Sequence, residues 1–331
     1  PRLAVPQTVN SIVVHYQEIA LKGRNRPYFI SKLVHNLRKQ TADLGVKDVR
    51  ALMGRIEVVL GPAASYDLVS ERIRRVFGIA NFSKAGRAPR TFEAIADAVV
   101  ADLEGLAPAS FRVSAKRGDK SFPMTSPELE RELGARIVER FGWRVNLDHP
   151  EMTVMVEVLP KQAFYSFGKE KGAGGMPTGV SGRVACLMSG GIDSPVAAWR
   201  LMKRGCSVVP VHFHSYPFLS RASQEKVREI CEVLTRHQMR TSLKLVPFGE
   251  LQRQVVLTVP PPMRVVIYRR LMLRIAERIA RDPAAKSATD PSAANKSWSA
   301  AARGASGGNW PATMSLRRAP RHCSSRSSHA A

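Results

Sequence analysis

Residues 187–195 read Leu-Met-Ser-Gly-Gly-Ile-Asp-Ser-Pro; they begin with the last two residues of an apolar run at 184–188 and precede a helical pattern at 196–202. Gly190 and Gly191 let the backbone approach a phosphate closely, and the N–H groups that open the next helix attract an anion. Ser189 and Ser194 add hydroxyl donors, whereas Asp193 suits a phosphate site only if a divalent cation lies between them. The stretch therefore predicts a nucleotide site that uses Mg²⁺. An ordinary strand–turn–helix connection is the alternative.

Around this turn the chain alternates strands and helices. Strands are predicted at 184–188, 207–213 and 242–246, and helices at 195–204, 224–237 and 265–280. Such alternation is typical of a parallel sheet with helices on both faces, which binds ligands at the carboxyl ends of its strands. The glycine turn follows one such end, and His212, Phe213 and His214 occupy another. The P-loop G-x-x-x-x-G-K-[ST] and the Rossmann G-x-G-x-x-G are both missing, which disfavours those two nucleotide-binding classes.

The first half of the chain has a different pattern. Residues 11–84 predict the order β-α-β-β-α-β of a ferredoxin-like unit, with a hairpin about Gly54 and a helix opened by Asn25 and Pro27. A second small α/β region is predicted at 92–167, and glycines crowd the stretch that follows. We therefore expect a multidomain protein of α/β and α+β class. Its expected parts are 1–77, 78–168, a linker at 169–183, an incomplete parallel-sheet domain at 184–282 and a tail at 283–331.

The 331 residues carry a formal net charge of +24, from 51 Lys and Arg against 27 Asp and Glu. This excess favours a polyanionic partner, nucleic acid ahead of a membrane surface. No apolar run is long enough to span a membrane, and none resembles a signal peptide. The four cysteines, Cys186, Cys206, Cys231 and Cys323, form no C-x-x-C pair, which predicts a cytoplasmic protein without a zinc or disulfide framework.

Beyond residue 281 the composition changes abruptly. Residues 281–331 contain no Val, Ile, Phe or Tyr, and Ala and Ser make up 23 of these 51 residues. Because such a composition cannot assemble a core, we expect the tail to be disordered.

The Ser-Gly-Gly-x-Asp-Ser string resembles the PP-loop of ATP pyrophosphatases, which split ATP between the α- and β-phosphates. Four further stretches are similar, in the same order, to the tRNA 4-thiouridine synthetases of the ThiI family. They are His-Tyr-Gln-Glu-Ile-Ala-Leu-Lys-Gly-Arg-Asn-Arg at 15–26, Phe-Arg-Val-Ser-Ala-Lys-Arg with Lys-Ser-Phe-Pro at 111–123, Gly-Gly-Met-Pro-Thr-Gly at 174–179, and Val-His-Phe-His-Ser with Arg-Arg-Leu-Met-Leu-Arg at 211–215 and 269–274. The resemblance covers residues 10–282.

That resemblance implies a fold and a reaction. Such enzymes bind tRNA with a ferredoxin-like domain and a THUMP domain, and they adenylylate O4 of uridine-8 with ATP. Sulfur from the persulfide of a cysteine desulfurase then displaces AMP to give 4-thiouridine. The family also supplies sulfur for the thiazole of thiamine, which implies a thiamine sulfur-carrier protein as a further partner. A homodimer is expected from the family alone.

The resemblance also implies roles for single residues. Ser189 and Asp193 are the expected catalytic residues, with Asp193 holding Mg²⁺, and the nucleotide-binding set is Leu187, Met188, Ser189, Gly190, Gly191, Asp193, Ser194, His212, Phe213 and Arg269. Seven basic residues of the first half are candidate tRNA phosphate contacts: Lys22, Arg24, Arg26, Arg112, Lys116, Arg117 and Lys120.

The chain departs from the family after residue 282. The family continues with a T-G-E-x-x-G-Q motif and, later, a cysteine that carries the persulfide, where this sequence has its Ala/Ser-rich tail. We interpret the tail as a frameshifted or wrongly assigned reading frame. Cys231 lies on an apolar helical stripe and is expected in the core, as is Cys186, and no role is assigned to Cys206 or Cys323. Two other functions stay open: another PP-loop ligase with a small carbonyl substrate, and an inactive tRNA-binding remnant.

Overall fold

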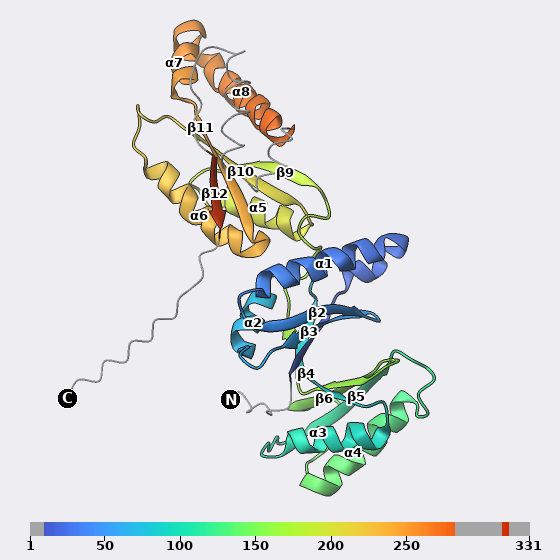
Figure 1. Cartoon of the computed structure of the whole chain (residues 1–331). Coiled ribbons are helices and arrows are strands. Elements are labelled where there is room, and N and C mark those ends of the chain that lie inside the picture. Colours follow the sequence, from blue (N-terminus) through green and yellow to red (C-terminus); the bar gives the residue numbers. More distant parts are fainter. Residues whose placement is uncertain (1–9, 282–312, 318–331) are drawn as a thin grey trace, which may run out of the picture. The chain divides into compact units, whose positions relative to one another are not determined.

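The chain divides between Met176 and Pro177 into two units, and each is described by itself. The computed structural model describes residues 10–281 and the backbone of 313–317 (Figure 1). The expected boundary between residues 77 and 78 lies inside the first unit. In the described part of the chain no helix is both long and apolar enough to cross a membrane.

The first half of unit 1 has the expected ferredoxin-like topology. Its elements are β1 (Ser11–His15), the short 3-10 helices η1 (Glu18–Leu21) and η2 (Gly23–Asn25), α1 (Arg26–Thr41), β2 (Val46–Leu52), β3 (Arg55–Leu60), α2 (Tyr66–Ile73) and β4 (Asn81–Ala88). The strands run antiparallel in the order β2-β3-β1-β4. The stripe of α1 packs Leu33 and Leu37 against Ile12 and Val58 of the sheet, all fully buried. The apolar stripe of α1 therefore packs on the apolar face of the sheet, which the alternation of residues along the strands creates.

The second half of unit 1 extends the same sheet. It contains α3 (Phe92–Leu103), β5 (Phe111–Arg117), α4 (Ser126–Phe141), β6 (Met152–Val158) and β7 (Ala163–Ser166). A capping box opens α4, because Thr125 accepts from the N–H of Glu128 while the Glu128 carboxylate accepts from the N–H of Thr125. The sheet continues as β4-β7-β6-β5, with β5 parallel to β6. Its core includes Phe111, Ile95 and Leu133.

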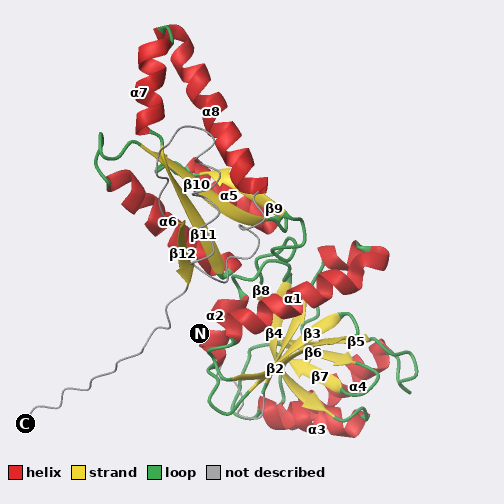
Figure 2. Ribbon diagram, turned by 45° about the horizontal axis from the view of Figure 1, so that its top comes forward, coloured by secondary structure: helices red, strands yellow, loops and turns green. Residues whose placement is uncertain are grey.

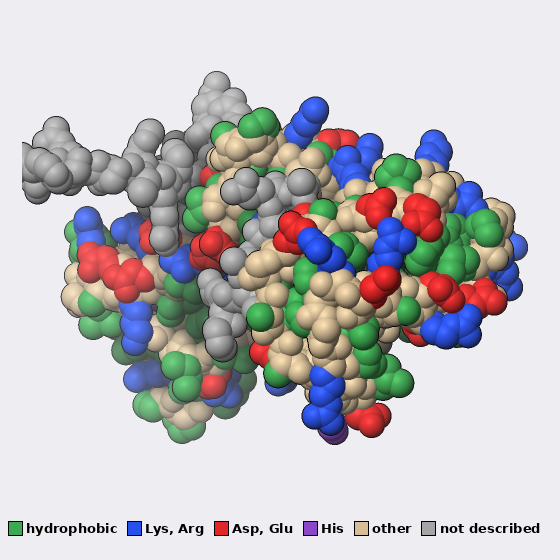
Figure 3. All heavy atoms as spheres, turned by 90° about the horizontal axis from the view of Figure 1, so that it is seen from below, with side chains coloured by type: hydrophobic (Ala, Val, Ile, Leu, Met, Phe, Trp, Pro, Cys, Tyr) green, Lys and Arg blue, Asp and Glu red, His purple; other side chains and the backbone are tan. Residues whose placement is uncertain are grey.

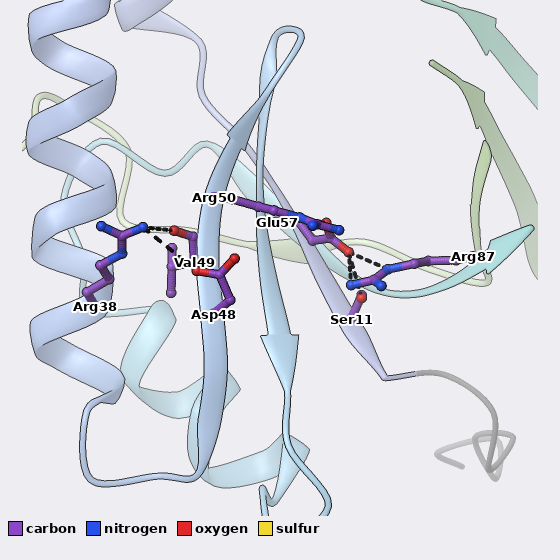
Figure 4. A network of polar contacts seen from close by, with 7 residues as sticks. All are labelled: Ser11, Arg38, Asp48, Val49, Arg50, Glu57 and Arg87. Atoms are coloured by element: carbon purple, nitrogen blue, oxygen red, sulfur yellow. Dashed lines mark hydrogen bonds and ion pairs between the residues drawn. The ribbon is translucent and has the colours of Figure 1, made fainter. Parts of the chain in front are cut away.

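One strand, β4, serves both halves of this sheet. Residues 81–85 pair with β1, and residues 86–88 pair with β7. Buried carboxylates reinforce the join. Glu57 on β3 is fully buried and accepts hydrogen bonds from Ser11 at 2.8 Å, Arg50 at 2.8 Å and Arg87 at 2.5 Å (Figure 4).

A second carboxylate, Glu157 on β6, accepts from Nε2 of His15 at 2.9 Å and from Arg55. These contacts join β6 to β1 and β3, which belong to the ferredoxin-like half.

The glycine-rich stretch differs from the expected linker at 169–183. Residues Glu170–Lys171 form β8, which pairs with β4. The Gly172 N–H then donates to the Ala80 carbonyl at 3.0 Å, and the Gly174 N–H donates to the Ile79 carbonyl at 2.7 Å. A Cβ on Gly172 would lie 2.3 Å from the Ile79 oxygen, so only glycine fits there. The first part of the stretch is thus bound to unit 1.

Unit 2 contains the expected parallel sheet. Its elements are β9 (Arg183–Leu187), α5 (Asp193–Lys203), β10 (Ser207–His214), α6 (Ala222–Gln238), β11 (Arg240–Pro247), α7 (Gly249–Thr258) and α8 (Pro261–Arg281). β10 lies between β9 and β11 and is parallel to both. Val209 and Val211 of β10 pack against Ile279 of α8, whereas alternate residues face α5 and α6. Helices therefore cover both faces, as Figure 2 shows.

Two features of unit 2 were not expected. The sequence pattern did not predict α7. Residues Thr313–Arg317 lie in the tail expected to be disordered, yet they form β12, antiparallel to β11. A ladder of backbone hydrogen bonds does not need apolar side chains, so composition alone did not exclude this strand. The rest of 283–331, including Cys323, lies outside the described residues.

Candidate nucleotide site at the carboxyl edge of the second sheet

The glycine turn lies where the sequence places it, between β9 and α5. The N–H of Met188 donates to the Val211 carbonyl at 2.8 Å, which extends the ladder by one residue past β9. Residues 189–194 form the glycine turn, whose last two residues, Asp193 and Ser194, also begin α5, with Pro195 in the first turn of that helix. Met188 is buried, while Ser189, Gly191 and Asp193 are exposed. The strand end is therefore fixed in the sheet and the turn faces solvent.

Two hydroxyls close the turn from within. The N–H of Ser189 donates to Oγ of Ser194 at 3.1 Å, and that hydroxyl donates back to the Ser189 carbonyl at 3.3 Å. The N–H of Gly191 donates to Oγ of Ser189 at 3.3 Å. These bonds hold the turn in one shape and occupy the N–H groups of Ser189 and Gly191, so an anion would be bound by the other N–H groups of the turn.

His212 lies beside the turn and joins three elements. Its Nδ1 donates to the Met188 carbonyl at 2.9 Å, and its Nε2 accepts from Oγ of Ser223, in the first turn of α6, at 3.4 Å. Burial lowers the pKa of His212, and the bond to Met188 only partly offsets this. The ring is therefore neutral at physiological pH, so His212 positions the turn rather than adding positive charge to it. A role in lining the nucleotide pocket stays a prediction.

The remaining expected pocket residues are Phe213, near the carboxyl end of β10, and Arg269, on α8. Phe213 points to the α8 side, with its ring centroid 5.4 Å from that of Phe248. Phe248 in turn lies 6.1 Å from Tyr268, the neighbour of Arg269 on α8. Arg269 is exposed. Its proposed reach to the nucleotide therefore stays a prediction.

Sequence reasoning missed Lys226, on the second turn of α6. A Cβ built on Gly190 would lie 3.3 Å from Cδ and 3.9 Å from Cε of Lys226. The lysine stem thus lies against the glycine turn. Since 36 residues separate the two in sequence, only the fold shows that they meet.

The candidate RNA contacts fall into two kinds. Lys22, Arg24 and Lys116 are exposed, as are Arg26 and Lys120, although Arg26 also donates to the Ala20 carbonyl at 2.6 Å. The other two candidates, Arg112 and Arg117, donate hydrogen bonds to backbone carbonyls. Arg112 donates to the Leu147 carbonyl at 3.1 Å, and Arg117 donates to the Met124 carbonyl at 2.9 Å. On the face in Figure 3, basic and acidic side chains are interspersed.

The described cysteines do not show the features of a sulfur carrier. Cys186 and Cys231 are buried, and Cys206 is half-buried. Burial raises the pKa of the Cys231 thiol to about 12, with smaller contributions from Cys186 and Glu232. Burial also raises the pKa of Cys186. Because the thiolate is the reactive form, both buried thiols are inert at neutral pH.

The turn offers Mg²⁺ a single carboxylate, that of Asp193. Among the described residues no three His, Cys, Asp or Glu side chains gather into a metal site. Mg²⁺ bound by one carboxylate together with nucleotide phosphates and water needs no such cluster. The exposed Asp193, at the start of α5, is suited to that arrangement.

Comparisons with known proteins agree with this architecture. Family models match in order: the ThiI ferredoxin-like domain at residues 11–83, the THUMP domain at 89–166 and the thiamine biosynthesis protein ThiI at 179–294. The last match runs beyond the expected boundary at 282.

The relatives are similar over most of the chain. A probable tRNA sulfurtransferase of Thermus thermophilus is 46% identical over 277 residues, which are 83% of this chain and 67% of the relative. One of Moorella thermoacetica is 42% identical over 82% of this chain and 69% of its own length. The crystal structure of a 4-thiouridine synthetase–RNA complex with bound ATP superposes with a TM-score of 0.71, at 35% identity, over 82% of this chain and 70% of that one. This chain therefore belongs to the ThiI family of tRNA sulfurtransferases.

Proposed function

We propose that this sulfurtransferase binds ATP at the turn of residues 189–194 and uses it to activate O4 of uridine-8 in tRNA. The observation that carries the proposal is the preorganised glycine turn at the carboxyl edge of a parallel sheet, closed by Ser189 and Ser194. The ATP and RNA bound to the related 4-thiouridine synthetase support the same substrates here.

The chemistry follows from the leaving group that the reaction needs. A carbonyl oxygen leaves poorly until it is joined to an acidic group. In the proposed first step, O4 attacks the α-phosphorus while the bond from that phosphorus to the bridging oxygen breaks. The electron pair leaves with pyrophosphate, and the uracil loses its N3 proton. The product is an O4-adenylylated base. The terminal sulfur of a persulfide then attacks C4 while AMP leaves with the electron pair of the C4–O4 bond, and a second thiol reduces the resulting disulfide to release 4-thiouridine.

The residues of the chain have positioning roles in this step. Leu187 and Met188 would flank the nucleoside, and the backbone of 189–194 would bind the phosphates. Asp193 would hold Mg²⁺, which neutralises phosphate charge. His212 keeps the turn in register with α6 through Met188 and Ser223. Catalysis here rests on position and electrostatics.

We propose that the sulfur comes from another protein, because among the described thiols Cys186 and Cys231 are buried and Cys206 is half-buried. We propose a cysteine desulfurase as the persulfide donor, a thiamine sulfur-carrier protein as a second acceptor, and a homodimer as the assembly. The free thiols favour a reducing, cytoplasmic setting.

Pyrophosphate release with ATP and unmodified tRNA tests the proposal. We expect release with wild-type tRNA, little with a tRNA that carries cytidine at position 8, and none from Asp193→Ala, which should still bind tRNA. Label from α-³²P ATP should appear on the tRNA when no sulfur donor is present.

Two results would favour the alternatives. Salt-independent or negligible tRNA binding would indicate a small-substrate ligase, because contacts to phosphates weaken as salt rises. Salt-dependent binding without pyrophosphate release would indicate an inactive remnant.

A further inference from the structure

The turn that we assign to the phosphates contains no basic residue of its own. Between Ser189 and Ser194 the only charged side chain is that of Asp193. His212, the nearest histidine, has a pKa lowered by burial and is neutral. ATP carries several negative charges, and only part of them is balanced by one divalent cation. Neither the turn nor His212 therefore supplies a cation, and Arg269 of α8 is assigned to the nucleotide by the family resemblance alone.

Lys226 lies where such a cation is needed. The side-chain stem runs over Gly190, with Cδ at 3.3 Å and Cε at 3.9 Å from the position of a Cβ on that glycine. Because a C–N single bond is about 1.5 Å long, the ammonium lies within about 5.4 Å of the same position. A flexible lysine spans that distance to reach a phosphate bound on the turn.

The element that carries Lys226 is fixed against the turn. The first turn of α6 is joined to His212 through Ser223, and His212 in turn holds the Met188 carbonyl. Gln224 and Val227, which lie on α6 on either side of Lys226 in the sequence, are buried. The base of the lysine is therefore anchored while its end is exposed.

The charge of Lys226 is also uncommitted. Glu225 and Glu229 lie nearby on α6, but no hydrogen bond or ion pair joins Lys226 to any residue that the structure describes. An exposed lysine that covers a glycine turn and pairs with no carboxylate is arranged as a point charge for a phosphate.

We infer that Lys226 binds the β- and γ-phosphates of ATP and stabilises the departing pyrophosphate. This inference rests on the proposed function, because it assigns a further residue to the same site. The α-phosphate must stay open to the uracil oxygen. When the bond to the bridging oxygen breaks, its electron pair moves onto the pyrophosphate, so a cation there lowers the barrier. A Cβ at position 190 would make the lysine stem shift by a few tenths of an ångström.

The test compares nucleotides that differ only in these phosphates. Titration calorimetry with Mg²⁺ would measure the affinities of the full chain for ATP and for AMP. We expect Lys226→Met to weaken ATP binding by about 10- to 100-fold and AMP binding by less than about threefold, because a charge-assisted contact is lost. Lys226→Arg should restore most of the affinity. Lys203→Met is the matched control, because that lysine lies at the other end of α5, over the Trp199 ring.

The outcomes are separable. Equal weakening of ATP and AMP by Lys226→Met would mean that the lysine only supports the turn, and unchanged ATP binding would mean that its ammonium stays in solvent. Either result overturns the inference and leaves the proposed function intact. If the wild-type chain binds neither nucleotide, the proposed function fails first. Lys226→Gln, a smaller change, serves if the methionine variant does not fold.

Discussion

Glu157→Gln should weaken the join between the two halves of unit 1. The carboxylate is 11% exposed and accepts from His15, which is 21% exposed, and from Arg55, which is 12% exposed. The amide removes the negative charge and leaves both basic groups partly buried without an anion. Breaking one partner of a buried pair in this way destabilises a protein by about 3–5 kcal/mol.

The pKa of Glu157 gives a second measure of the same effect. Burial raises this pKa, but the hydrogen bonds and charges of His15 and Arg55 outweigh burial and lower it from 4.5 to about 2. Because one decade in proton affinity is worth about 1.36 kcal/mol, folding gains about 3 kcal/mol from the ionised carboxylate. The folded state binds fewer protons, so this stability is present in full above pH 4.5. It is lost as the pH falls toward 2.

Hydrogen exchange read by mass spectrometry measures the effect locally in the full chain. In peptides from β1 and β6, Glu157→Gln should raise the exchange rate by about 150-fold at neutral pH, which corresponds to about 3 kcal/mol. The same peptides of the wild-type protein should lose protection between pH 4.5 and 2. Glu93→Gln is the matched control, because its pair with Arg136 is exposed and should contribute less than about 1 kcal/mol.

Two results would refute this reasoning. One is exchange in Glu157→Gln that rises no more than in Glu93→Gln, which would mean that the buried pair adds nothing beyond an exposed one. The other is an equal loss of protection in β10 of unit 2, which would mean that the substitution acts globally.

Two further predictions concern a glycine and the cysteines. Gly172→Ala should lower the melting temperature, because the new Cβ would lie 2.3 Å from the Ile79 carbonyl oxygen. Gly168→Ala is the control and should leave the melting temperature unchanged, because a Cβ there has open space around it. Equal effects of the two substitutions would contradict the packing described here. Iodoacetamide at pH 8 should label Cys206 well before Cys231, because a pKa of about 12 leaves about one Cys231 thiol in 10,000 ionised. Peptide mapping over time would show the order, and early labelling of Cys231 would contradict its burial.

The sequence predicted the regular elements best where the apolar period was clear. The strand predicted at 207–213 is observed as Ser207–His214, and the helix predicted at 224–237 is observed as Ala222–Gln238. The missed helix α7 contains Val-Val-Leu-Thr at 255–258, a run that favours strand, and its helical state depends on tertiary packing of Val255. The strand β8 has only two residues, too few to show the alternation of apolar and polar residues that predicts a strand.

The polar contacts of the fold could not be predicted, because they join residues far apart in sequence. In the strand Arg55–Leu60, the alternation places Glu57 on the face opposite Ile56 and Val58, where solvent is the ordinary expectation. Glu57 is instead fully buried, because β4 and the strands beyond it continue the sheet and bring Arg87. The same holds for Lys226, which is an ordinary surface residue by its pattern. The glycine turn itself was found because its chemistry lies within six consecutive residues.

The shared strand β4 restricts how the two halves of unit 1 can move relative to each other. A single eight-residue strand without a break runs from one module into the other, so the two modules cannot swivel independently. The spacing between the surfaces of the two halves is therefore fixed. If both halves contact tRNA, as the candidate phosphate contacts predict, the tRNA would have to present its phosphates at that fixed spacing, and its shape would contribute to recognition.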